Sequence, residues 1–182
     1  MKFFSNAELF AVIVSVTSVG ISLIGNRTQE RLLAASVWPY LSFNTGNTSD
    51  DGQRQVISLA VVNSGNGPAR IRQFTLEYDH KNIAAASGLL QGCCDLKPEI
   101  VLTSPIVGKV LRPGEQVTFL QLPFAAEIAE GWHRFDKARF GFIFSACYCS
   151  TLDECWSVRS DQSDPEPVAA CKDMPREQQW HG

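Results

Sequence analysis

The feature that most constrains this chain is an uncharged apolar segment near its N-terminus. Residues 9–25, LFAVIVSVTSVGISLIG, contain no Asp, Glu, Lys or Arg and are dominated by Val, Ile, Leu, Phe and Ala. As a helix rising about 1.5 Å per residue, the segment is about 25 Å long, just enough for the hydrocarbon core of a bilayer. We therefore predict a short N-terminal flank at 1–8, a transmembrane helix at 9–25 and a juxtamembrane linker at 26–36.

Two alternatives to an uncleaved anchor follow from the same segment. A signal peptide has a shorter apolar core and a small-residue cleavage site directly after it. Residues 26–31 do not resemble such a site, and the small residues at 34–36 come too late. A buried core helix is the other alternative. The predicted partner of residues 9–25 is the lipid bilayer, crossed once.

The positive charges that flank the segment are almost equal in number on its two sides, so they only weakly predict its orientation in the membrane. Lys2 and the α-amino group lie on one side, and Arg27 and Arg31 lie on the other, which leans slightly towards a cytoplasmic C-terminal domain. The six cysteines, all C-terminal to the helix, favour the opposite orientation. Disulfides persist in the periplasm and not in the cytosol.

The remainder of the chain has the size of one domain, about 145 residues. Its net charge of −3 supplies no basic field, so nucleic acid is not an expected partner. We place the domain at 37–159. Residues 160–182 are rich in Asp, Glu and Pro, which predicts a loosely ordered tail unless Cys171 ties it down.

Short segments of alternating apolar residues, separated by turns that contain Gly and Pro, predict a mainly β domain built as a two-sheet sandwich. Residues 55–63 (QVISLAVVN) are apolar on both faces, which is typical of a central strand, and 69–78 alternate through Ile71 to Tyr78. Pro39 makes the strand at 37–43 an edge strand, followed by a polar loop at 44–52. Further strands are expected at 100–103, 106–111, 117–122, 138–149 and 155–159, with one or two helical turns at 125–132.

Two turns separate these strands, Asn63-Ser-Gly-Asn-Gly-Pro-Ala69 and Leu111-Arg-Pro-Gly-Glu115. We expect Gly65 and Gly67 to adopt positive φ and Pro68 to fix φ where the next strand begins. Pro113 and Gly114 occupy the central positions of a type II turn. A phosphate-binding loop would need a helix after the glycines, whereas a strand follows.

The two turns together resemble the N-x-G-x-x-P/A and L-x-P-G-E pattern of bacterial immunoglobulin-like domains of the cell-adhesion-related (CARDB-like) type. The resemblance covers roughly residues 56–122 and implies an immunoglobulin-like β-sandwich with a binding or spacer role. Residues 35–41, the Cys93-Cys94 pair and residues 147–156 depart from those modules. They are more similar to a group of uncharacterised bacterial single-pass membrane proteins, which implies a bacterial inner-membrane location and supplies no activity.

The cysteines predict disulfide bonds. Cys149 and Cys155 flank five residues and face each other if their strands pair, with Cα atoms about 4.5 Å apart, at the short end of the disulfide range. Cys147 projects on the same face as Cys149 and is expected to reach Cys93 or Cys94 in a loop. Six cysteines allow up to three bridges, so Cys171 is also a candidate.

Zinc is the rival interpretation of the cysteines. Cys93, Cys94, Cys147 and Cys149 would surround the ion, with Cys155 or His133 as a substitute. Structural zinc sites usually use C-x2-4-C knuckles, and an adjacent Cys-Cys and a C-x-C fit them poorly. Ordinary buried thiols are the third alternative. We predict no metal and no cofactor.

No catalytic residues are predicted. His80 follows Asp79 where a turn is expected, His133 lies beside an aromatic residue, and His181 lies in the tail. The chain lacks G-x-S-x-G and H-E-x-x-H. Aromatic side chains are instead expected to pack in the core and across strands: Phe135, Phe140, Phe142, Phe144, Tyr148 and Trp156.

Two classes of function fit these observations. The first is a non-catalytic, membrane-tethered binding or accessory module, on the periplasmic side, that recognises another protein or an envelope component. The alternative is a cytoplasmic-facing membrane sensor or effector component with reduced or zinc-bound cysteines.

Overall fold

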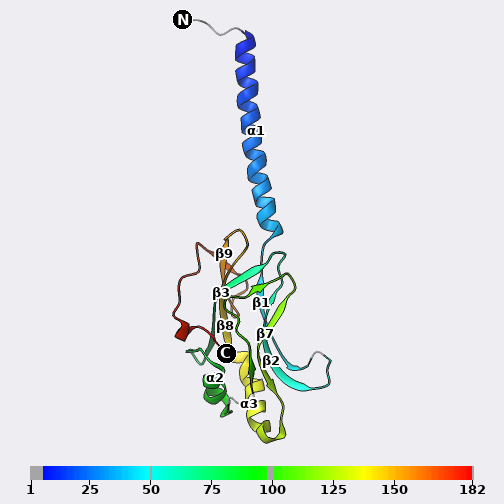
Figure 1. The fold of residues 1–182 in the computed structure, drawn as a ribbon, viewed down its shortest axis with the longest axis vertical. Coiled ribbons are helices and arrows are strands. Elements are labelled where there is room, and N and C mark those ends of the chain that lie inside the picture. Colours follow the sequence, from blue (N-terminus) through cyan, green and yellow to red (C-terminus); the bar gives the residue numbers. More distant parts are fainter. Residues whose placement is uncertain (1–5, 50, 98–100, 182) are drawn as a thin grey trace. The chain divides into compact units, whose positions relative to one another are not determined.

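The computed structural model describes residues 6–49, 51–97 and 101–181. The chain falls into two compact units that divide between Ser36 and Val37. The first is a helix and the second contains all the strands (Figure 1).

Helix α1 spans Asn6–Ser36 and is the one helix in the described chain that is long and apolar enough to cross a membrane. It continues through the predicted linker at 26–36, which contains no Gly or Pro that would end it. The hydroxyls of Ser15, Ser18 and Ser22 donate to carbonyl oxygens one turn earlier in the helix. These polar groups are therefore satisfied within the helix, as an apolar surrounding requires.

A charge placed within the apolar segment of this helix is expected to weaken membrane insertion. Arg in place of Val14 would lie three residues from the midpoint of residues 9–25 and cost up to about 2.5–3.5 kcal/mol, the value for the centre of a span. Fractionation of cells that express the full chain is expected to show less of Val14→Arg than of the control Val14→Leu in the membrane. A parent protein that stays soluble without detergent would contradict the assignment of an anchor.

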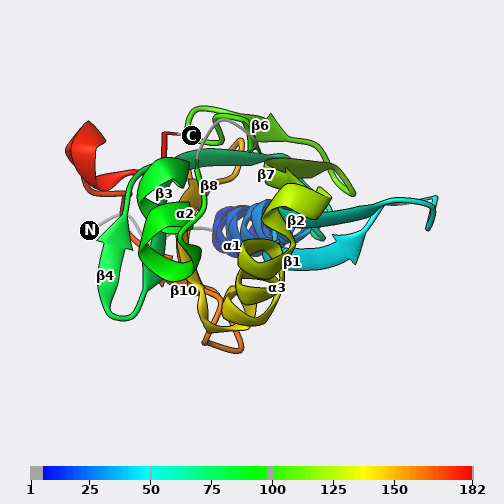
Figure 2. The ribbon, with the colours of Figure 1, turned by 90° about the horizontal axis from the view of Figure 1, so that it is seen from below.

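Within the described residues, the second unit consists of two antiparallel sheets (Figures 1 and 2). One has four strands in the order β1-β2-β7-β5: Leu41–Thr48, Gln55–Asn63, Gln116–Pro123 and Leu102–Thr103. The other has the order β10-β9-β8-β3-β4: Glu166–Val168, Cys155–Arg159, Ile143–Cys149, Ala69–Tyr78 and Lys81–Ile83, with β6 (Val110–Leu111) also paired to β3.

The mainly β prediction is confirmed, and several strands lie where the alternation placed them. β2, β3 and β9 have the predicted bounds, β2 is central between β1 and β7, and β1 is an edge strand. Residues 44–48, predicted as a loop, belong instead to β1, because their backbone pairs with β2. Strand β6 is shorter than the strand expected at 106–111, and β5 lacks residue 101 of the strand expected at 100–103, whose residue 100 lies outside the described residues.

Two helices depart from the predicted pattern in part. Helix α2 spans Ala86–Cys94 and buries Leu89 and Leu90, so the Cys93-Cys94 pair, expected in a loop, ends a helix. The helical turns predicted at 125–132 are present as the 3-10 turn η2 (Ala126–Ile128) and the start of helix α3 (Ala129–Ala138). Helix α3 and the 3-10 turn η3 (Arg139–Gly141) then take the place of the first part of the strand predicted at 138–149. Trp132 and Phe135, three residues apart, form the buried face of α3, which lies beside α2 (Figure 2).

Aromatic side chains join the two sheets in one core. The ring centroids of Phe74 on β3 and Phe119 on β7 lie 4.9 Å apart, and Phe43 on β1 stacks on Phe144 of β8. Most of the predicted core aromatics are buried or half-buried. Phe140 is the exception: it is 73% exposed on η3, and the Arg139 guanidinium lies over its ring.

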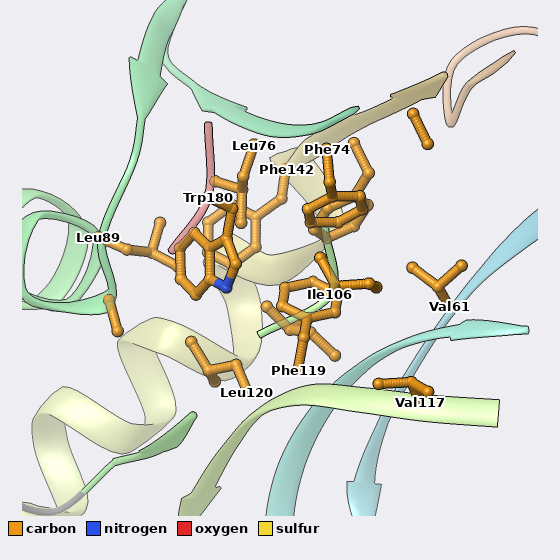
Figure 3. Close-up of a cluster of buried hydrophobic side chains, with 14 of the residues drawn as sticks. Val61, Phe74, Leu76, Leu89, Ile106, Val117, Phe119, Leu120, Phe142 and Trp180 are labelled. Carbon is orange, nitrogen blue, oxygen red and sulfur yellow. The ribbon is translucent and has the colours of Figure 1, made fainter. Parts of the chain in front are cut away.

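The C-terminal segment is docked on the domain, and Cys171 ties it down, which is the exception allowed in the prediction of a loose tail. Trp180 is 1% exposed and lies among core side chains that include Leu89 and Phe119 (Figure 3). Its backbone N–H donates to the carbonyl of Phe74, 2.9 Å away, and the His181 N–H donates to Ala84 at the same distance. Strand β10 and the pairing of Cys171 hold the segment before it.

Candidate functional site

The chemically distinctive residues lie on the outer face of the six-stranded sheet. Cys147 and Cys149 are two residues apart on β8 and therefore share a face, opposite the face that carries Ala146 and Tyr148 into the core. The register of β8 with β9 places Cys155 directly across from Cys149. The hairpin thus gathers three cysteines at one end of this face.

The structure contains three disulfide bonds, and none of its cysteines is free. Cys149 pairs with Cys155, as the hairpin predicted, with Cα atoms 4.0 Å apart. Cys147 pairs with Cys171 and not with Cys93 or Cys94, which bond to each other at the end of α2. The reason is the docked C-terminal segment, which brings Cys171 to the outer face of the sheet.

The two bridges on the sheet are close neighbours. The Sγ atoms of Cys149 and Cys171, which are not bonded to each other, lie 3.8 Å apart. They border a cavity of about 530 Å³ between the sheet and the C-terminal segment. Its lining includes three of the four cysteines of these two bridges, Cys149, Cys155 and Cys171. The other lining residues are Arg72, Gln73, Asp153, Ala169, Ala170, Lys172, Asp173, Met174 and Gln179.

Opposite charges surround this cavity. Arg70 lies directly across from Cys149 in the β3–β8 register and forms an ion pair with Asp153 in the hairpin turn. Arg72 and Lys172 contribute two further positive charges to the lining and Asp173 one negative charge. Arg70 is therefore a cross-strand neighbour of Cys149, with its guanidinium paired to Asp153.

Tyr148 lies between the two cysteines of β8 but faces the core. Its ring stacks on Trp156 across the hairpin, and its hydroxyl accepts a hydrogen bond from the Leu41 N–H at 3.5 Å. Burial raises the pKa of Tyr148 to about 12. The phenol therefore stays protonated at neutral pH and is a packing residue.

The ligands named in the rival zinc interpretation are not brought together. In the described residues, the group of three possible ligand atoms that all lie within 4.8 Å of one another belongs to Cys149, Cys155 and Cys171. Cys93 and Cys94 bond to each other, and His133 is exposed beside Trp132 and Phe124. A cysteine binds zinc as a thiolate, which a disulfide sulfur does not provide.

The two predicted turns meet at one buried side chain, Asn63. Its Nδ2 donates to the carbonyls of Gly67 (2.8 Å) and Leu111 (3.0 Å), one in each turn segment. Its Oδ1 accepts from the backbone N–H groups of Tyr40 and Gly65, at 3.2 and 3.1 Å. Asn63 is 0% exposed, so this residue of the motif holds the fold together and is not available to a ligand.

The second turn has the predicted geometry. Gly114 has φ of 75°, and the Glu115 N–H donates to the carbonyl of Arg112 at 3.0 Å, as in a type II turn with Pro113 before the glycine. The carboxylate of Glu115 accepts from the Arg112 N–H at 2.9 Å, and this hydrogen bond lowers the pKa of Glu115. Glu115 is therefore part of the turn, a role that the sequence did not reveal.

The first turn needs its glycines for a different reason from the one expected. Neither Gly65 nor Gly67 has positive φ. A Cβ on Gly67 would overlap the backbone of Val37, and one on Gly65 would overlap backbone atoms of residues 38–40. Close approach of the chain before β1 therefore requires glycine at both positions, and Pro68 leads into β3.

Gly67→Val is expected to destabilise the second unit by about 1–3 kcal/mol or more, because backbone atoms have to move. Gly114→Val is expected to cost about 1–3 kcal/mol for a different reason, its positive φ. Asn66→Ala, at an exposed position of the same turn, is the control and is expected to change stability by less than about 0.5 kcal/mol. Urea unfolding of each variant measures these differences, and a Gly67→Val protein that unfolds like the parent would contradict the steric account.

The two remaining histidines lie apart from the cysteines in the fold. His80 is exposed in the β3–β4 turn with φ of 59°, as a turn residue was expected to be. His181 is exposed next to the end of the chain, where its ring nitrogen contacts the Gln179 carbonyl.

No family model matches the chain, and no curated protein matches it either. The resemblance to CARDB-like domains therefore stays a prediction that rests on the two turn motifs.

Proposed function

We propose that this chain is a membrane-anchored, non-catalytic binding or accessory module that displays an immunoglobulin-like β-sandwich domain on the periplasmic side of the bacterial inner membrane. The single apolar helix followed by a two-sheet unit supports the anchored arrangement. Its proposed partner is another protein or a component of the envelope.

The observation that carries the proposal is the pairing of all six cysteines. Three disulfides in one small domain are typical of an oxidising compartment, since cytosolic reductants keep thiols reduced. One bridge joins β8 to the segment that leads to Trp180. This bridge thus supports the docked C-terminal segment whose Trp180 lies in the core.

The location is tested by fusing reporter enzymes after Gly182 of the full chain. Alkaline phosphatase is expected to be active and β-galactosidase inactive, because alkaline phosphatase needs an oxidising compartment to form its own disulfides. The phosphatase fusion on Val14→Arg is the control and is expected to show lower phosphatase activity, because insertion is weakened. An active β-galactosidase fusion on the parent chain would overturn the periplasmic location.

A cytoplasmic-facing sensor or effector is the second candidate function. The observation that favours it is the group of three sulfurs within 4.8 Å, which would become thiolate ligands for zinc if the bridges were reduced. Metal analysis of protein purified under reducing and non-reducing conditions separates the two candidates. The first candidate predicts disulfides and no stoichiometric zinc in the protein isolated without reductant.

A further inference from the structure

The Sγ atom of Cys149 has the Sγ atoms of Cys155 and Cys171 as close neighbours. Cys149 is bonded to Cys155 across the hairpin, and its Sγ lies 3.8 Å from the Sγ of Cys171, which belongs to the second bridge. Thiol–disulfide exchange proceeds by attack of a thiolate on one sulfur of a disulfide. A thiolate at Cys149 would have a disulfide sulfur as its immediate neighbour.

We propose that the two bridges form a thiol–disulfide exchange site, in which Cys149 changes its partner from Cys155 to Cys171 and the co-reactant is a dithiol of another protein. This inference deepens the proposed function and rests on it, because both bridges have to be formed. The cavity supplies access, since it is lined by Cys149, Cys155 and Cys171, while Cys147 is outside its lining.

The exchange transfers two electrons and two protons from the incoming dithiol to this chain. A thiolate of the incoming dithiol attacks Cys155, a mixed disulfide forms, and the Cys149–Cys155 bond breaks with its electron pair on Cys149. The Cys149 thiolate then attacks Cys171, so that a Cys149–Cys171 bond forms and Cys147 leaves as a thiolate. The second thiol of the co-reactant resolves the mixed disulfide and releases Cys155. The co-reactant becomes a disulfide, and its two protons end on Cys147 and Cys155.

Two features of the site favour this path. Arg70 lies directly across the ladder from Cys149 and is paired with Asp153. Arg72 and Lys172 in the cavity lining, against Asp173, leave the site with one positive charge in excess, and neighbouring positive charge favours the thiolate form of a cysteine. Cys171 lies between strand β10, which ends at Val168, and the 3-10 turn that begins at Arg176. Its backbone is therefore outside the sheet ladder, which allows Cys171 to change partner without breaking a strand pair.

Two variants that remove the same bridge test the proposal. In Cys155→Ser, the free Cys149 is expected to attack Cys171, so that a Cys149–Cys171 linkage forms and Cys147 becomes the free thiol. In the matched control Cys149→Ser, Cys155 is expected to stay free and the Cys147–Cys171 linkage to stay intact. Full-length proteins are purified without reductant, quenched in acid, labelled with a maleimide and mapped by mass spectrometry under non-reducing conditions.

The parent protein is treated in parallel with limiting dithiothreitol as the dithiol probe. The expected intermediate carries a Cys149–Cys171 linkage and labels on Cys147 and Cys155, with Cys93–Cys94 serving as a bridge outside the site. A Cys155→Ser protein labelled on Cys149 alone would overturn the exchange, as would equal rearrangement in Cys149→Ser. A parent isolated with free thiols would instead overturn the proposed location together with the site, so the two failures are distinguishable.

Discussion

Trp180→Ala is expected to lower the free energy of unfolding of the second unit by roughly 3–5 kcal/mol, the usual cost of truncating a buried tryptophan. Trp180 is 1% exposed, and its ring meets Phe119 edge to face at a centroid distance of 5.6 Å. Its removal would leave a cavity among residues from both sheets and from α2 (Figure 3). The C-terminal segment would then depend on the Cys147–Cys171 bridge and on β10.

Urea unfolding of residues 37–182 under non-reducing conditions measures this effect, with tryptophan fluorescence and far-ultraviolet circular dichroism as the two signals. His181→Ala is the matched control, because its side chain is exposed and the backbone bond from His181 to Ala84 is retained. The control is expected to unfold within about 0.5 kcal/mol of the parent. Equal stability of Trp180→Ala and the parent would show that the C-terminal segment does not complete the core.

Asn63→Leu is expected to cost at least about 3 kcal/mol, because four backbone groups lose a hydrogen-bond partner and each buried unsatisfied group costs about 1–3 kcal/mol. The groups are the N–H of Tyr40 and Gly65 and the carbonyls of Gly67 and Leu111. The leucine side chain has similar size but offers neither donors nor acceptors.

Asn63→Asp removes the Nδ2 donor of this side chain and keeps its acceptor oxygen, so it tests the two sets of hydrogen bonds separately. It keeps an oxygen for Tyr40 and Gly65 but turns another oxygen towards the carbonyls of Gly67 and Leu111, in a site with no exposure. We expect it to be destabilised as well, since a buried charge without a partner is costly. Urea midpoints of both variants close to that of Asn66→Ala would contradict the assignment of Asn63 as the residue that joins the two turns.

The strands could be predicted because their signals are local. Residues 55–63 and 69–78 have apolar side chains in the pattern of a strand, and β2 and β3 lie there. The Cys149–Cys155 bond was also a local inference, since strand pairing across a short hairpin brings the two residues opposite each other.

The features that the sequence did not reveal depend on contacts between distant residues. Nothing near Trp180 indicates that its ring enters a core built from residues 41–158, or that Cys171 meets Cys147. The glycine at 67 looked like a turn residue, but its role is set by Val37, thirty positions earlier in the chain. Trp180 itself was the available signal, as a large apolar residue in an otherwise polar segment.

The central claim, an oxidised domain outside the cytoplasm, is tested most directly by the state of the cysteines in growing cells. Cells that express the full chain are quenched in acid, and the protein is alkylated with a maleimide of high mass before and after reduction. We predict no added label before reduction and six labels after it, one for each cysteine in the sequence. Six labels before reduction would contradict the account and place the domain in the cytoplasm.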